Sequence, residues 1–417
     1  MRSIAMMISL WCWMGTTGWV VAQDNELYFR QAQQALEQKQ YQKAQQHCRT
    51  ILRQSPQHWD AHLLLTYASA RQGKFEEAEA SLTQMYAKMT SMDSVARHVL
   101  HEAILCETRL SYWKGNNAEA IRRANRGMIL FPESLALGML KGKAALGESS
   151  YDTAITSFNQ VLVQQPDFQE AQRLRDEAYW RKARYQAGVS YGHQIFTRSA
   201  FPRHTVNIEL TRFWKTLTLT GRISRSYQFG IVSHQTDLEG WKLLSRRWYL
   251  YGQLACSDAR LFPRYRASLE PYYKVGASVE VSAGVRYFRY IDQPTWMYTA
   301  SASKYLRQGM IMTRVLYSPT PAGGRTNFEA GGRWFMPDAY NFVELKVGSG
   351  ISPDNTYLGA TYQEIRRSHS LYTILGVQKR FPHQWLGKVW GVVDQQMPEP
   401  GTPFSVISLN AGVWKRF

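Results

Sequence analysis

Residues 406–417, at the end of the chain, alternate strictly between two kinds of side chain. One face carries Ile407, Leu409, Ala411, Val413, Lys415 and Phe417, and the other carries Ser408, Asn410, Gly412, Trp414 and Arg416. This period of two is typical of a β-strand with one apolar side. Similar segments follow one another from Gly188 onward, separated by Gly, Pro, Asn, Asp and Ser. We therefore expect the second half of the chain to form a large sheet.

The polar faces of these segments carry charges of both signs. They supply the candidate lumen residues Arg222, Glu280, Arg286, Arg325, Glu329, Arg333, Glu344 and Lys346. A soluble sandwich would bury the apolar faces, whereas a barrel in lipid turns them outward and encloses the polar ones. Alternation alone does not separate the two. Aromatic residues near segment ends, as at Trp214, Trp248 and Trp334, favour the barrel because such residues line membrane interfaces.

The N-terminus has the pattern of an export signal over residues 1–22: a basic start, an apolar stretch and a small residue at the exit. No later apolar run is long enough for a helical membrane anchor. This segment contains Cys12, and its removal would leave Cys48, Cys106 and Cys256. Because an odd number of cysteines is no disulfide framework, we expect Cys48 and Cys106 to be buried free thiols. A disulfide between them is the alternative.

The C-terminal strand, ending on Phe417, resembles the closing strand of bacterial outer-membrane barrels. The resemblance implies an assembly signal at Leu409, Val413 and Phe417, with the barrel-assembly machinery and outer-membrane lipid as partners. Lys415 departs from it, since that position is usually apolar or aromatic. At about 9–11 residues per crossing and with an even strand number, residues 187–417 predict an antiparallel transmembrane β-barrel of about twelve strands. The implied location is the outer membrane of a Gram-negative bacterium.

Residues 23–166 repeat a helical unit. Alanines recur at Ala44, Ala78, Ala120 and Ala154, in steps of 34, 42 and 34 residues. Tyr41, Phe75, Asn117 and Tyr151 precede them by three residues, and Pro56, Pro132 and Pro166 close three of the units. The pattern resembles the tetratricopeptide repeat, whose small residue lets two helices pack closely. The longer step predicts an eight-residue insertion near Met89 to Ser94, and residues 167–186 predict a polar capping helix.

The repeat resemblance implies a groove lined by the first helix of each unit, with a periplasmic protein or peptide as partner. Its candidate residues are Tyr67, Arg71, Arg109, Tyr112 and Lys143; the alternative is that they are ordinary solvated side chains. Two histidine pairs, His58 with His62 and His98 with His101, have spacings that could hold zinc. No further ligand pattern completes a site, so we expect structural histidines, no metal and no cofactor.

The formal net charge of +18 is unevenly distributed. Residues 1–183 hold 21 basic and 18 acidic residues, and residues 184–417 hold 29 and 14. In a soluble protein such an excess would suggest nucleic acid. In a barrel two other interpretations rank higher: rim cations that meet lipopolysaccharide phosphates, or a lumen that attracts anions. No nucleic-acid partner is expected.

Four stretches of the second half look like the YaiO-type outer-membrane barrel: Leu261–Arg266, Gly284–Tyr290, Tyr298–Leu306 and Gly348–Asp354. The likeness spans roughly residues 185–417, and its specificity comes from the order of these short motifs. That family often pairs the barrel with tetratricopeptide repeats, as expected here. The resemblance implies no catalytic residues.

Three functions are compatible with this organisation. The first is export or passage of a polymer such as exopolysaccharide, because the layout is similar to exporters of such polymers. The second is a membrane-anchored scaffold whose repeats recruit periplasmic proteins, with no open pore. The third, an enzyme acting on lipid A or phospholipid, needs a nucleophile beside a base. The barrel half holds His193, His204, His234, His369 and His383, with Ser368-His369-Ser370 near a turn, but no nucleophile motif. We therefore expect no enzymatic activity.

Overall fold

The computed structural model describes residues 24–88, 94–289, 294–320, 323–336, 338–350, 368–398 and 402–417. The chain divides into two compact units, Met1–Arg181 and Lys182–Phe417. The expected export signal and most of the expected insertion lie outside the described residues. No helix in the described ranges is both long enough and apolar enough to cross a membrane.

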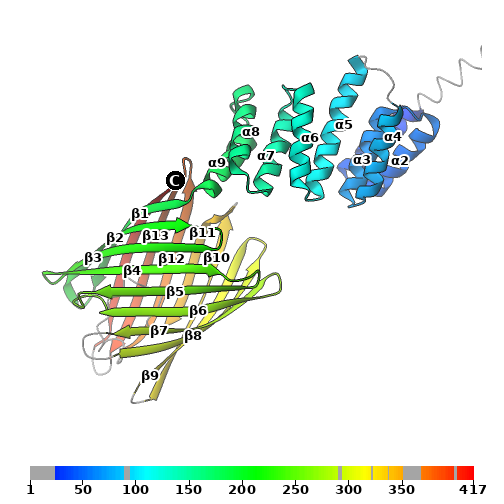
Figure 1. Ribbon diagram of the computed structural model, residues 1–417. Helices are drawn as coiled ribbons and strands as arrows, with labels where there is room; N and C mark the ends of the chain where they lie inside the picture. The colour runs from blue at the N-terminus through cyan, green and yellow to red at the C-terminus, as the bar shows by residue number, and fades with distance from the viewer. Residues whose placement is uncertain are drawn as a thin grey trace, which may run out of the picture. The chain divides into compact units, whose positions relative to one another are not determined.

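The first unit is an array of paired helices (Figure 1). A helix over residues 24–37 precedes eight labelled ones. These are α2 (Tyr41–Gln54), α3 (Trp59–Arg71), α4 (Phe75–Lys88), α5 (Ser94–Trp113), α6 (Asn117–Leu130), α7 (Leu135–Gly147), α8 (Tyr151–Gln164) and α9 (Gln169–Lys182). Each helix packs mainly on its sequence neighbour, which is the arrangement of a repeat array.

The repeated alanines explain this packing. Ala44, Ala78, Ala120 and Ala154 lie on α2, α4, α6 and α8 and are completely buried, so the helices of each pair approach closely. The longer step between the second and third units is partly taken up by α5, which has 20 residues where α3 has 13.

The same left-handed turn joins the two helices of every pair. Gly73 (φ 80°) and Gly115 (φ 81°) occupy this position in two units, and Lys39 and Ser149 (both φ 59°) occupy it in the others. Glycine adopts this conformation without steric cost, whereas a side chain with a Cβ is strained there. The first and last units therefore hold a strained residue where the middle units hold glycine.

The second unit is a closed antiparallel barrel in which β1 pairs with β14 and every other strand pairs with its sequence neighbours (Figure 1). Its strands are β1 (Tyr185–Phe196), β2 (Ser199–Phe213), β3 (Leu217–Gln228), β4 (Ile231–Leu243), β5 (Trp248–Ser257), β6 (Tyr265–Val275), β7 (Val279–Arg289), β8 (Pro294–Leu306), β9 (Gly309–Thr320), β10 (Gly323–Met336), β11 (Asp338–Ser349), β12 (Ser368–Phe381), β13 (Trp385–Pro398) and β14 (Phe404–Arg416). Closure leaves no unpaired sheet edge, as a sheet in lipid requires.

The prediction of about twelve strands is wrong, because the described residues form fourteen. The physical reason is the brevity of several turns. Phe196 is separated from Ser199, Gln228 from Ile231, and Leu306 from Gly309 by two residues each. Such turns leave more of the chain for membrane crossings than the sequence-based count allowed.

The two ends of the barrel differ. At one end β1 begins, β14 ends, and the connections are short, as at residues 214–216, 244–247 and 307–308; we call this the short-turn end. At the opposite end, hereafter the loop end, the connection between β5 and β6 spans residues 258–264.

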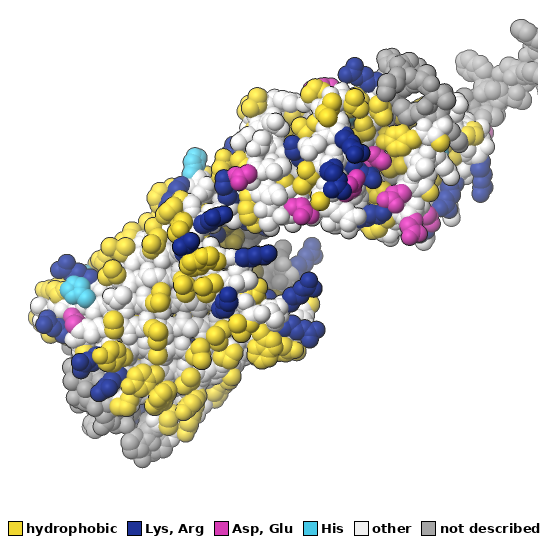
Figure 2. Space-filling model, in the orientation of Figure 1, with side chains coloured by type: hydrophobic (Ala, Val, Ile, Leu, Met, Phe, Trp, Pro, Cys, Tyr) yellow, Lys and Arg dark blue, Asp and Glu magenta, His cyan; other side chains and the backbone are white. Residues whose placement is uncertain are grey.

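The barrel is apolar outside and polar inside. Outward side chains such as Ile208, Ile223 and Leu254 are 60–64% exposed, while inward Asn207 and Ser224 are buried. Figure 2 shows hydrophobic side chains across the visible barrel wall, with Lys and Arg gathered toward its ends. A soluble sheet protein would have the reverse distribution, so the outer surface is suited to hydrocarbon.

Candidate functional site: the barrel interior

The barrel interior contains a belt of ionised side chains near the middle of the strands. Its first centre is Asp237 on β4, which is completely buried. It contacts the Arg266 guanidinium on β6 and accepts a hydrogen bond from Gln253 Nε2 at 2.9 Å. The contact to Arg266 passes over β5, so it joins strands that are not neighbours.

Arg222 extends the belt from β3. Its Nε donates to Glu209 Oε1 on β2 at 2.7 Å, and its Nη atoms lie 3.6 Å from Asp237 Oδ1 and 3.5 Å from Glu239 Oε1. Three carboxylates around one guanidinium offset the desolvation that a buried cation would otherwise suffer.

The belt crosses the seam at which the barrel closes. Trp414 on β14 donates its indole Nε1–H to Glu209 Oε2 on β2 at 2.9 Å, passing over β1. Gly188 on β1 makes this possible, because a Cβ there would lie 1.9 Å from Trp414 Cδ1. A side chain cannot occupy Gly188 without displacing the indole.

A second centre surrounds Glu270 on β6. Arg286 Nη2 on β7 lies 3.0 Å from Glu270 Oε2, and Ser282 Oγ donates to Glu270 Oε1 at 2.6 Å. Arg314 on β9 lies 3.8 Å from both Glu270 and Glu329 on β10. Tyr372 on β12 donates its hydroxyl to Glu329 Oε2 at 2.6 Å, which extends the contacts to a further strand of the barrel.

A third centre is Glu344 on β11. Arg333 Nε on β10 donates to Glu344 Oε2 at 2.7 Å, and the Nζ atoms of Lys346 and Lys388 each lie 3.8 Å from the carboxylate. Together the three centres connect most of the wall with buried charge pairs. Breaking one such pair typically costs about 3–5 kcal/mol, because the remaining charge stays buried.

An aromatic cluster lines the interior nearer the short-turn end. It consists of Trp241, Tyr249, Tyr251 and Tyr272, which continue the inward faces of β4, β5 and β6 in steps of two from the belt toward the short-turn end. The ring centroid of Trp241 lies 4.7 Å from that of Tyr251 and 5.5 Å from that of Tyr272, and Tyr249 stacks on Tyr272 at 4.8 Å. The Tyr249 hydroxyl is hydrogen-bonded to Glu280 on β7.

The structure distributes the candidate lumen residues among these features. Arg222, Arg286, Glu329, Arg333, Glu344 and Lys346 join the belt, Glu280 joins the aromatic cluster, and Arg325 lies toward the loop end. Sequence reasoning missed Asp237, Glu270, Arg266 and Arg314. The sequence alternation could have identified them as inward residues, since Asp237, for example, follows the polar residues Ser233 and Gln235 at steps of two.

The candidate assembly residues Leu409, Val413 and Phe417 all face outward and are exposed. The Phe417 carbonyl accepts the backbone N–H groups of Arg184 and Tyr185, which fixes the start of β1. The unusual Lys415 contacts the His383 carbonyl and lies 5.2 Å from the Trp385 ring centroid. Its ammonium therefore reaches the turn while its stem covers apolar surface.

The candidate groove residues of the repeats do not all meet. Tyr67 and Arg71 on α3 lie against Trp113 on α5, with ring centroids 5.4 Å apart for the two aromatics, and Arg71 also lies over Tyr41. Lys143 on α7 is separate and forms an ion pair with Glu170 on α9 at 2.9 Å. Arg109 and Tyr112 are half-buried on α5. Trp113, which sequence reasoning missed, completes an aromatic and cationic surface, hereafter the α3–α5 surface.

Three histidines of the repeats have structural partners. His58 caps α3 by accepting the Ala61 N–H, buried His62 contacts the Pro56 carbonyl at 3.2 Å, and His101 contacts Ser134 Oγ at 2.7 Å. Within the described ranges, no group of three His, Cys, Asp or Glu side chains is placed to hold a metal ion.

The barrel histidines do not assemble a nucleophile and base in the described residues. His193 and His204 lie side by side on the outward face of β1 and β2, with 3.4 Å between their Nδ1 atoms. Ser233 donates its hydroxyl to Asp258, not to the neighbouring His234. His383 lies in a turn, and the side chain of His369 is outside the described part.

The thiols of Cys48, Cys106 and Cys256 are free. Cys48 and Cys106 are buried in the repeats, where burial raises the pKa of Cys48 to about 12 and the pKa of Cys106 to about 11. Both are therefore protonated, unreactive core residues near neutral pH.

Comparison with known proteins gives a family model for part of each half of the chain. Residues 184–355 match the family model of the YaiO membrane beta barrel domain, and residues 35–88 match a tetratricopeptide repeat model. A search of curated proteins gave no match.

Solved structures resemble the chain only in part. A structure titled "CymD monoaromatic hydrocarbon channel" covers 60% of this chain and 92% of its own, with 8% identity and a TM-score of 0.39. One titled "Bacterial polysaccharide outer membrane secretin" covers 56% and 99%, with 9% identity and a TM-score of 0.35. "Crystal structure of MamA protein" covers 39% and 84%, with 17% identity and a TM-score of 0.32. These values support no inference about activity.

The family models agree with the architecture. A closed barrel with an apolar exterior fits an outer membrane, and paired helices with buried alanines fit the repeat. The chain therefore carries a YaiO membrane beta barrel domain in its second half and a tetratricopeptide repeat in its first half, as the sequence resemblance predicted.

Proposed function

We propose that the barrel passes a polymer such as an exopolysaccharide across the outer membrane, entering at the short-turn end. The observation that carries this proposal is the inward cluster of Trp241, Tyr249, Tyr251 and Tyr272 beside Glu280. The C–H face of a sugar ring packs on an aromatic face, and its hydroxyls need nearby acceptors. The cluster supplies both in one place.

The charge distribution supports a partly anionic cargo. The belt pairs most interior cations with carboxylates, so the excess positive charge of the barrel half lies toward its ends. At the short-turn end, exposed cations include Arg212, Lys215, Arg246, Arg247 and Lys274. Cations around a mouth raise the local concentration of an anionic chain.

The proposed orientation places the short-turn end and the repeats in the periplasm. In outer-membrane barrels the short turns face the periplasm and the longer loops face outward. The repeats precede β1, which begins at the short-turn end. Cargo or its carrier would then meet the repeats before the barrel.

Single-channel recording in planar bilayers tests the proposal, with alginate oligosaccharide as the anionic probe and maltodextrin as the neutral one. We expect an open conductance that alginate oligosaccharide blocks from one side, and weaker block in Trp241→Ala. Trp334→Ala is the matched control, because Trp334 is 60% exposed on the outer wall. Equal block in both variants would contradict the role of the cluster.

The second candidate is a membrane-anchored scaffold without an open pore. Two observations favour it: the belt fills the middle of the interior with buried charge pairs, and the α3–α5 surface presents Tyr67, Arg71 and Trp113 together. A barrel that stays silent in bilayers would support the scaffold. If a co-purifying periplasmic protein is lost in Arg71→Glu but retained in Arg49→Glu, the α3–α5 surface is its binding site. Arg49 is a suitable control because it is an exposed arginine on α2 that pairs with Glu77 on α4.

A further inference from the structure

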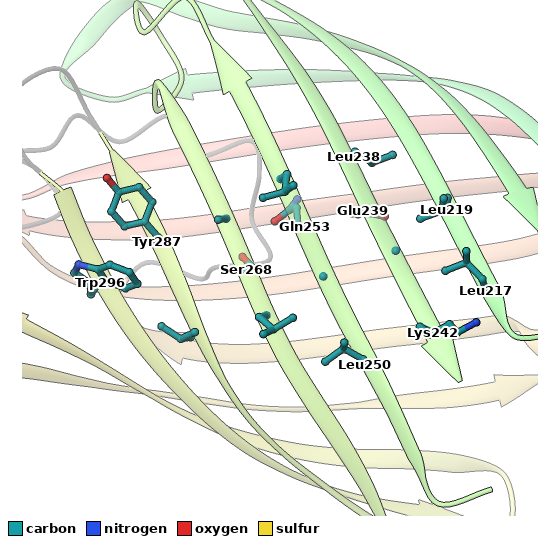
Figure 3. A pocket seen from close by; sticks show the side chains of 16 residues that line it. Leu217, Leu219, Leu238, Glu239, Lys242, Leu250, Gln253, Ser268, Tyr287 and Trp296 are labelled. Carbon is teal, nitrogen blue, oxygen red and sulfur yellow. The ribbon is translucent and has the colours of Figure 1, made fainter. Parts of the chain in front are cut away.

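The outer wall of the barrel contains a groove across β3 to β8, with a volume of about 760 Å³. Figure 3 shows Leu217, Leu250 and Lys242 at one end and Tyr287 and Trp296 at the other. Most residues that line the groove lie on the outward faces of their strands, whereas Glu239, Gln253 and Ser268 lie on the inward faces. Because a YaiO membrane barrel presents its outward face to lipid, the groove opens into hydrocarbon.

A missing side chain at Gly252 opens the groove. Gly252 on β5 pairs directly with Gly240 on β4, where a Cβ would lie 2.7 Å from Leu219 Cδ2, so the Leu219 side chain covers Gly240 but not Gly252. A Cβ built on Gly252 would meet nothing nearer than the Ser268 carbonyl oxygen at 3.9 Å, so the space above Gly252 is open. Leu238 and Leu254 stand beside this space and are at least half exposed.

The end of the groove near Lys242 is cationic. Residues 240–248 hold Lys242, Arg246 and Arg247 and no acidic residue. Lys242 Nζ donates to Thr216 Oγ1 at 3.1 Å, which places the ammonium beside the short turn after β2. Aromatic Trp248 and Tyr273 lie together at this level, with ring centroids 4.7 Å apart, as expected at a membrane interface.

We propose that this groove binds one acyl chain of an anionic glycerophospholipid, with the lipid phosphate at Lys242. Water cannot fill an apolar groove in hydrocarbon, and its volume lies within the usual range of ligand sites. The cations lie at the headgroup end, where they attract an anionic lipid by about 1 kcal/mol each, or about fivefold in affinity. This inference depends only on the barrel lying in a membrane and is independent of any polymer passage.

Native mass spectrometry of the delipidated full chain, titrated with dioleoyl phosphatidylglycerol or dioleoyl phosphatidylcholine, tests the site. We expect the wild type to prefer phosphatidylglycerol, and Gly252→Leu to lower its adducts about tenfold by filling the groove. Gly391→Leu should leave them unchanged. Gly391 is a matched control on the outer wall of β13, where a Cβ would meet Leu409 and the Ser408 carbonyl oxygen at 3.8 Å.

Lys242→Gln distinguishes the contribution of the lipid headgroup from that of the acyl chain. It should lower the preference for phosphatidylglycerol about fivefold while phosphatidylcholine adducts persist. The proposal is overturned if Gly252→Leu binds like the wild type, or if the wild type takes both lipids equally. It is also overturned if wild-type dimers vanish in Gly252→Leu, since a second copy would then occupy the groove. If Gly252→Leu fails to show heat-modifiable folding, the Lys242→Gln preference decides the outcome.

Discussion

Substituting Gly188 by alanine tests the contact between Trp414 on β14 and Glu209 on β2, which crosses the seam at which the barrel closes. The added Cβ would lie 1.9 Å from Trp414 Cδ1 and 2.4 Å from Nε1. The indole must therefore move, and it loses its 2.9 Å hydrogen bond to Glu209. Overpacking costs about 1–3 kcal/mol, and loss of a hydrogen bond to a charged group about 1.5–3 kcal/mol. We expect Gly188→Ala to lower the free energy of unfolding by about 3–5 kcal/mol.

Urea unfolding in detergent micelles, followed by heat-modifiable mobility, measures this loss. Gly221→Ala is the control, because no atom lies within 4 Å of a Cβ built on Gly221. In a Trp414→Ala background the cost of Gly188→Ala should fall below about 1 kcal/mol, since the two residues no longer collide. If Gly188→Ala and Gly221→Ala unfold with the same urea midpoint, the proposed role of the Trp414–Glu209 contact is refuted.

Further perturbations test other parts of the molecule. Val413→Lys should reduce the yield of heat-modifiable barrel, since a lipid-facing lysine costs about 2–4 kcal/mol at mid-bilayer. Removal of Phe417 should reduce this yield as well. Normal assembly of these variants would contradict the assignment of β14 as the closing strand. Among Cys48, Cys106 and Cys256 of the folded chain, a maleimide at pH 8 should label Cys256 alone, because burial raises the pKa of Cys48 to about 12 and that of Cys106 to about 11. Because these pKa values lie above the ordinary value of 9.0, the unfolded chain ionises its thiols at a lower pH than the folded chain does. The repeats should therefore lose stability as the pH rises above 9, which circular dichroism melting would detect. Ser149→Gly should raise the stability of the repeats by about 0.5–1 kcal/mol by removing left-handed strain; an unchanged melting temperature would contradict that strain.

The sequence predicted which face of each strand is polar because the side-chain period of two is a local property. Thr205, Asn207 and Glu209 alternate with Val206 and Ile208, and the structure separates them in the same way. The helical repeats were equally accessible, since the alanine positions mark the contact within each pair.

The interior contacts were beyond prediction because they depend on register and closure. Asp237 meets Arg266 over an intervening strand, and Trp414 meets Glu209 across the seam. Local alternation says that such side chains point inward but not which of them share a level of the barrel. The aromatic cluster illustrates the same limit, since Trp241 resembles an interfacial girdle residue in sequence yet lies inside the wall.

We expect the outward faces of the barrel strands to contact hydrocarbon and the inward faces to be shielded from it. The most direct test places single cysteines along β14 in a Cys48→Ser, Cys106→Ser, Cys256→Ser background, labels them with an environment-sensitive fluorophore in vesicles, and adds doxyl-labelled lipid as a quencher. Strong quenching should alternate, high at residues 407, 409, 411 and 413 and low at residues 408, 410 and 412. Uniform quenching along the strand, or a chain that stays soluble and unquenched, would contradict the account.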